Sequence, residues 1–109
     1  MFLKQYNIDK GLYLALARLN AKIKGYDPSQ LNFSENAKHK LNYKGINFGA
    51  ADYKDFIIYS LLEKRKDIEP GTANMHRKRY LARATNIKGD WAANKESKNN
   101  LAIHILWPS

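Results

Sequence analysis

The chain has 109 residues, a formal net charge of +9 and no cysteine, and 44% of its residues are hydrophobic. This length predicts one domain with a modest core, and seven Tyr, four Phe and two Trp argue against a largely disordered chain. Without cysteine, disulfides, thiolate metal sites and cysteine nucleophiles are excluded. The charge favours nucleic acid or another acidic partner, the alternative being an unspecialised basic protein.

Residues 9–24 are predicted to form the first helix, capped by Asn7 or Asp9 and ended by Gly25. Four apolar residues recur at helical spacing and should dock on the core: Leu12, Leu16, Leu19 and Ile23. A helix that binds a partner through this stripe is the alternative. Pro28 then favours a turn, and residues 30–37 are predicted to be a loop.

A β-hairpin is predicted next, with strands at residues 39–43 and 46–48 joined at Lys44-Gly45, where glycine allows a positive φ. The alternation of residue types assigns one set of side chains to a buried face, namely Leu41, Tyr43, Ile46 and Phe48. It assigns the other set to solvent, namely Lys40, Asn42 and Asn47. Because a lone hairpin is marginal in water, it must pack on helices.

Two further helices are predicted, one over residues 53–66 with Asp52 as its cap, and one over residues 73–86 with Thr72 as its cap. Five residues of the second should face the core: Ala73, His76 or Arg77, Tyr80, Leu81 and Ala84. Residues 101–107 fit either a strand or a short helix capped by Ser97, and we favour the helix. The predicted fold is a single α+β domain, a β-hairpin packed against three or four α-helices.

Eight basic residues and only two acids, Asp67 and Glu69, lie between positions 64 and 88. The candidate nucleic-acid-binding residues are Lys64, Arg65, Lys66, Arg77, Lys78, Arg79, Arg83 and Lys88. Arg79 and Arg83 are four residues apart on one helical face, which suits contacts to a phosphate backbone. Arg77 and Arg83 have an alternative role in holding the fold, by pairing with Asp52, Asp55 or Asp90, or by binding the C-terminal Leu-Trp segment or the carboxyl end of a helix.

No catalytic residue, metal site or cofactor is predicted. The three histidines are far apart in the sequence, and Asp52 and Asp55 are explained by helix capping. No nucleophile elbow, phosphate loop or dinucleotide fingerprint occurs. Three aromatic residues, Tyr43, Tyr80 and Trp91, have faces that suit base stacking, but core anchoring is the expected role of each.

The C-terminal part of the chain carries a distinctive order of residue blocks between Tyr43 and Trp107. The blocks are Ile46-Asn47-Phe48-Gly49, Tyr53-Lys54-Asp55-Phe56, Arg77-Lys78-Arg79-Tyr80-Leu81-Ala82-Arg83, Ile87-Lys88-Gly89-Asp90-Trp91, Ser97-Lys98-Asn99-Asn100-Leu101-Ala102 and Ile105-Leu106-Trp107. This order resembles a small, basic, uncharacterised protein family of large double-stranded DNA viruses of eukaryotes. Residues 1–30 lie outside the resemblance, Ala84 stands where many relatives have His, and residues 57–72 form a longer and more apolar link.

The resemblance implies a viral origin and association with virions or virus factories, but no reaction, because that family has no established one. We therefore expect a non-enzymatic protein that binds nucleic acid, double-stranded DNA in particular, through sequence-independent phosphate contacts. The alternative is a minor capsid or virion-interior protein that contacts an acidic capsid protein. No apolar run approaches the ~20 residues of a membrane span, and the first residues do not resemble a signal peptide. The expected location is the virion or the host-cell interior, with no membrane contact and no secretion.

Overall fold

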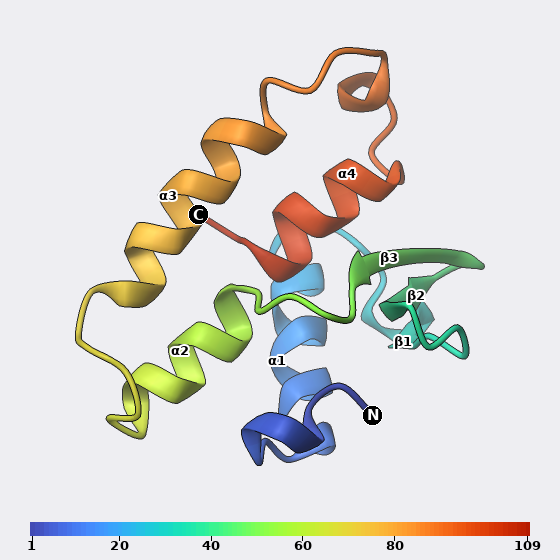
Figure 1. Cartoon of the computed structure of the whole chain (residues 1–109). Helices are drawn as coiled ribbons and strands as arrows, with labels where there is room; N and C mark the ends of the chain where they lie inside the picture. Colours follow the sequence, from blue (N-terminus) through green and yellow to red (C-terminus); the bar gives the residue numbers. More distant parts are fainter.

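The computed structural model describes all residues, 1–109, as four α-helices and a three-stranded antiparallel sheet that lies at one side of the molecule (Figure 1). The α-helices are α1 (Lys10–Ile23), α2 (Phe56–Lys64), α3 (Thr72–Ala84) and α4 (Lys98–Leu101). The strands are β1 (Leu31–Phe33), β2 (His39–Tyr43) and β3 (Ile46–Ala50). The predicted α+β class is confirmed, and the sheet and α3 lie on opposite sides of the molecule.

The predicted hairpin is present, and a third strand extends it. β2 and β3 pair antiparallel with Leu41 opposite Phe48, and both central turn residues, Lys44 and Gly45, have positive φ. β1 pairs with the other edge of β2, with Leu31 opposite Tyr43. The prediction of a loop over residues 30–37 was therefore wrong for β1. Three residues are too few to establish an alternating pattern, and the strand is defined by its pairing with β2.

Helix α1 begins at the predicted cap, since the Asp9 carboxylate accepts a hydrogen bond from the Leu12 backbone N–H at 2.9 Å. Its predicted orientation was wrong. The buried residues are Tyr13, Ala17 and Ala21, which follow each other at four-residue spacing. The predicted stripe lies on another face: Leu12, Leu19 and Ile23 are 47%, 51% and 69% exposed, and Leu16 is half-buried. Small alanines let α1 approach the core closely, which a pattern of large apolar residues does not reveal.

Helix α2 begins three residues later than predicted, and Asp55 rather than Asp52 caps it. The Asp55 carboxylate accepts from the Ile58 backbone N–H at 2.9 Å, whereas Asp52 is exposed. Helix α3 begins at Thr72, one residue earlier than predicted, and the predicted Thr72 cap was wrong, since the cap position is Gly71 and no side chain caps the helix.

The C-terminal segment is helical, as favoured from the sequence. The Ser97 hydroxyl accepts from the Asn100 N–H at 3.2 Å, and α4 continues into a π-helical turn at Ala102–Leu106. Leu101, Ile105 and Leu106 are fully buried in the core that the sheet, α1 and α2 share. This segment thus occupies the centre of the fold.

Candidate functional site

Helix α3 exposes a row of cations without any acid among its 13 residues, which span about 20 Å. Lys78, Arg79 and Arg83 are all exposed, and none takes part in the three ion pairs of the structure. At about 100° per residue, Arg79 and Arg83 lie on one side of the exposed ridge of α3 and Lys78 on the other.

Three other predicted cations lie beyond the two ends of α3. Lys64 ends α2 and Lys66 follows it, so both are on the side of the connection to α3, whereas Lys88 follows the C-terminal end of α3. All three are exposed and free of ion pairs. The six unpaired cations are therefore spread over the length of α3 and beyond both of its ends, rather than gathered in one compact patch. We call this row, Lys64, Lys66, Lys78, Arg79, Arg83 and Lys88, the α3 basic row.

The two remaining predicted residues hold the fold together. Arg65 donates to the backbone carbonyls of Tyr6 and Asn7 at 2.8 and 2.9 Å and pairs with Asp67, which ties the end of α2 to the N-terminal segment. Arg77 lies 4.4 Å from the centre of the Phe56 ring.

The alternative role of binding the C-terminal segment is confirmed for Arg77. Its guanidinium donates to the Pro108 carbonyl at 3.0 Å, while Tyr80 of the same helix stacks on Trp107 at 4.4 Å between ring centres. The alternative of pairing with an aspartate is wrong, since Asp55 pairs with Lys40, and neither Asp52 nor Asp90 has an ion pair.

A cleft of about 600 Å³ opens beside the basic row, between α3, the C-terminal helical segment and the connection from β3 to α2. Side chains far apart in the sequence meet there. The ordered sequence blocks supply most of the lining residues, among them Gly49, Tyr53, Tyr80, Arg83, Leu106 and Trp107. No acidic residue lines the cleft, whereas Lys54, Arg83 and Lys98 do.

Stacked aromatic rings line this cleft. Besides the Tyr80–Trp107 pair, Tyr59 of α2 stacks on His76 of α3 with ring centres 4.2 Å apart. Burial raises the pKa of Tyr80, and the nearby charge of Arg83 opposes that shift. Tyr53 is the only tyrosine that is largely exposed, at 72%, and it makes none of the ring–ring contacts.

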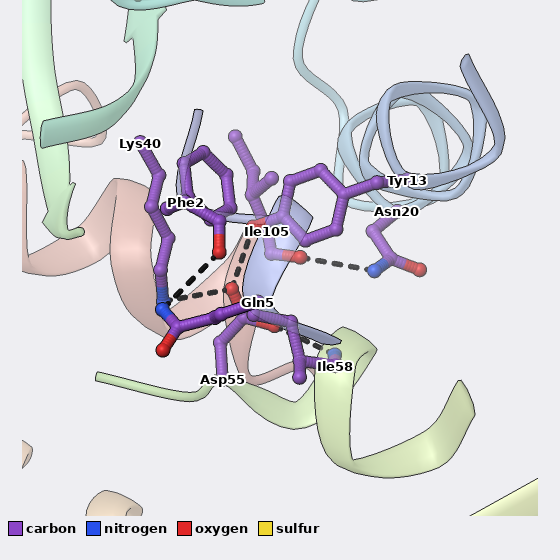
Figure 2. Close-up of polar contacts among 8 residues, drawn as sticks. All are labelled: Phe2, Gln5, Tyr13, Asn20, Lys40, Asp55, Ile58 and Ile105. Carbon is purple, nitrogen blue, oxygen red and sulfur yellow. Dashed lines mark hydrogen bonds and ion pairs between the residues drawn. The ribbon is translucent and has the colours of Figure 1, made fainter. Parts of the chain in front are cut away.

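A buried polar cluster lies next to the cleft (Figure 2). Tyr13, Lys40 and Asp55 come from α1, β2 and the start of α2, and their polar atoms point toward one another. Lys40 Nζ and the Tyr13 hydroxyl both donate to Asp55 Oδ2, at 3.0 and 2.6 Å. Lys40 was predicted to face solvent and is instead 3% exposed, because the Asp55 carboxylate compensates its charge.

The predicted site thus omitted the residues across the cleft, Lys54 and Lys98, and the exposed Tyr53. All three belong to the ordered sequence blocks, but no spacing in the sequence indicates that the fold brings them to α3. No group of three or more His, Asp or Glu side chains is placed to hold a metal ion. None of the helices combines the length and apolar character needed to cross a membrane. Comparisons with protein families, with curated proteins and with solved structures found no match.

Proposed function

We propose that this protein binds nucleic acid through sequence-independent contacts between the α3 basic row and phosphates. The observation that carries the proposal is a helix whose outer face presents unpaired Lys78, Arg79 and Arg83 and which contains no acid. The side chains of these three cations make no hydrogen bond or ion pair within the fold and remain available to a polyanion. Arg65 and Arg77, in contrast, donate hydrogen bonds to backbone carbonyls of the protein itself. The proposed activity is binding rather than catalysis.

Phosphate contacts account for both the charge and its arrangement. Each phosphate neutralised by a Lys or Arg releases counterions, so affinity falls steeply as salt rises. Duplex DNA carries one charge per about 1.7 Å of its axis, so a row spread along a helix of about 20 Å meets several phosphates. No base-reading motif is present, and binding should therefore show little sequence preference.

A matched pair of charge reversals tests the proposal in a gel-shift titration. One variant replaces Lys78, Arg79 and Arg83 by Glu; the control replaces the exposed Lys4, Lys10 and Lys22 by Glu. Both lower the net charge from +9 by the same six units. The first variant should lose binding to DNA and retention on heparin, and the control should keep most of both. Equal losses would mean that net charge alone, and not α3, holds the polyanion.

The viral setting is part of the proposal and depends on the resemblance of residues 43–107. In a virion or a virus factory, a basic protein would meet viral nucleic acid at high concentration, where modest phosphate contacts suffice. Detection of the protein in purified virions by mass spectrometry would test this setting, and its absence from both virions and factories would contradict it.

A second candidate function has one specific observation in its favour. The apolar side chains of Leu12, Leu19 and Ile23 face solvent on α1 together with half-buried Leu16. A virion-interior structural protein, in which α1 docks into a neighbouring protein, would cover this stripe. Light scattering separates the candidates: a nucleic-acid-binding module should be monomeric and shift DNA alone, whereas a structural component should oligomerise or co-assemble.

A further inference from the structure

We infer that the cleft beside α3 takes an unpaired nucleobase together with its phosphates, so that the protein prefers single strands to duplexes. This inference depends on the proposed nucleic-acid binding and specifies its substrate. The single juxtaposition that carries it is an exposed aromatic ring, Tyr53, in an acid-free cleft that also contains Lys54, Arg83 and Lys98.

The position of Tyr53 is unusual for a tyrosine that serves only the fold. It lies in the connection between β3 and α2, is 72% exposed, and stacks on no other ring. The other cleft tyrosines have packing partners, since Tyr59 stacks on His76 and Tyr80 on Trp107. An open aromatic face beside cations is the combination with which proteins bind single-stranded nucleic acid, because any base can stack on it.

The charges around this ring suit phosphates. Lys54 lies 5.4 Å from the Tyr6 ring centre and 5.8 Å from that of Tyr59, and these aromatic contacts hold its ammonium group beside the cleft without neutralising it. Arg83 belongs to the α3 basic row and lines the cleft as well, so a strand bound along α3 would pass the cleft. Lys40 also lines the cleft, but its charge is already compensated by Asp55.

The size and shape of the cleft favour an unpaired base over a duplex. Its volume of about 600 Å³ is within the range of small-ligand sites, roughly 300–1,000 Å³, which accommodates one nucleotide. A base in a duplex is stacked on both faces and cannot offer one to Tyr53, whereas a single strand can turn a base outward at little cost. The inference therefore departs from the double-stranded DNA expected from the sequence.

Fluorescence anisotropy with two labelled probes tests the inference. The probes are an oligothymidylate of about 16 nucleotides and a fully paired duplex of the same length. Wild type should bind the single strand more tightly than the duplex. Tyr53→Ala should weaken single-strand binding about ten-fold and leave duplex binding within about two-fold. Tyr53→Phe should retain wild-type affinity, because it keeps the ring. Met75→Ala, which removes an exposed apolar side chain of α3 outside the cleft, should change neither affinity.

The outcomes separate this inference from the proposed function. If wild type binds the duplex as tightly as the single strand, or if Tyr53→Ala weakens both equally, phosphate binding stands and the base site is rejected. If wild type binds neither probe, the proposed function fails and the inference fails with it. An oligouridylate of the same length tests single-stranded RNA. If it binds as tightly as the oligothymidylate, the site accepts single strands of both RNA and DNA.

Discussion

Lys40 Nζ lies 3.0 Å from Asp55 Oδ2, and these two side chains are only 3% and 1% exposed. The same carboxylate accepts from the Tyr13 hydroxyl and caps α2 through the Ile58 N–H. One aspartate therefore joins the first helix, the central strand and the start of α2. Because α2 carries Tyr59 and packs against α3, this pair fixes the framework on which the cleft is built.

Replacing Asp55 by Asn should destabilise the protein strongly. The amide can still cap α2, but the ammonium group of Lys40 would be left buried without a countercharge, which typically costs about 3–5 kcal/mol. Urea unfolding followed by circular dichroism measures the loss. Asp52→Asn is the matched control, since Asp52 is exposed and has no ion pair, and it should change stability by less than about 0.5 kcal/mol. Equal effects of the two changes would contradict the buried pair.

Tyr13→Phe should remove a hydrogen bond to a buried carboxylate and lower stability by about 1.5–3 kcal/mol. Burial, and then the charge of Asp55, raises the pKa of the Tyr13 hydroxyl well above its ordinary value. A raised pKa means that the unfolded chain loses this proton first, so stability is fully present below about pH 10 and falls as the pH rises further. Wild type should therefore lose stability above pH 10 more steeply than Tyr13→Phe. A steeper loss in the variant would reverse the sign and refute the assignment.

Gly49→Ala should destabilise the protein more than Gly45→Ala. Gly49 and Gly45 both have positive φ, +79° and +87°, and this left-handed conformation destabilises an alanine by about 1–2 kcal/mol. At Gly49 the new methyl group would also lie 2.7 Å from Leu106 Cδ1, whereas at Gly45 nothing lies within 4 Å. Thermal unfolding of the two variants isolates the contact between β3 and the C-terminal segment. Similar melting temperatures would show that Leu106 does not pack there.

Arg77 and Lys78 are neighbours in sequence and should behave in opposite ways. Arg77→Ala removes the contact with Phe56 and the bond to Pro108, so it should cost about 1–2 kcal/mol of stability. Lys78→Ala should cost less than about 0.5 kcal/mol, because its side chain is exposed and free of ion pairs. Lys78→Ala should instead weaken DNA binding. Unfolding and gel-shift titrations on both variants measure the two effects. A larger stability loss for Lys78→Ala than for Arg77→Ala would contradict these assignments.

Much of the fold is encoded locally and was predictable. The hairpin follows from alternation and from Gly45, α1 from the Asp9 cap, and the C-terminal helix from Ser97. The orientation of α1 was not predictable, because its buried face is formed by the small residues Ala17 and Ala21 beside Tyr13. Alanines do not form a recognisable apolar stripe, and their burial depends on the shape of the core against which they pack. Strand β1 escaped prediction because its pairing with β2, and not its own sequence, defines it.

The candidate site was predictable only in part. Charge density identified the cations of the α3 basic row. It could not distinguish them from Arg65 and Arg77, whose roles depend on backbone carbonyls distant in sequence. The burial of Lys40 likewise depends on Asp55, 15 residues away. The acid-free cleft forms where the β3–α2 connection, α3 and the C-terminal segment pack together, and no local sequence pattern predicts it.

The salt dependence of DNA binding tests the central claim most directly. The slope of log K against log salt concentration reports the number of phosphates that are neutralised, at about 0.9 per phosphate for duplex DNA. Changing Lys78, Arg79 and Arg83 together to Gln should make the slope shallower by about three such contacts, while the same change at Lys4, Lys10 and Lys22 should leave it nearly unaltered. An unchanged slope in the α3 variant would contradict phosphate binding by this helix.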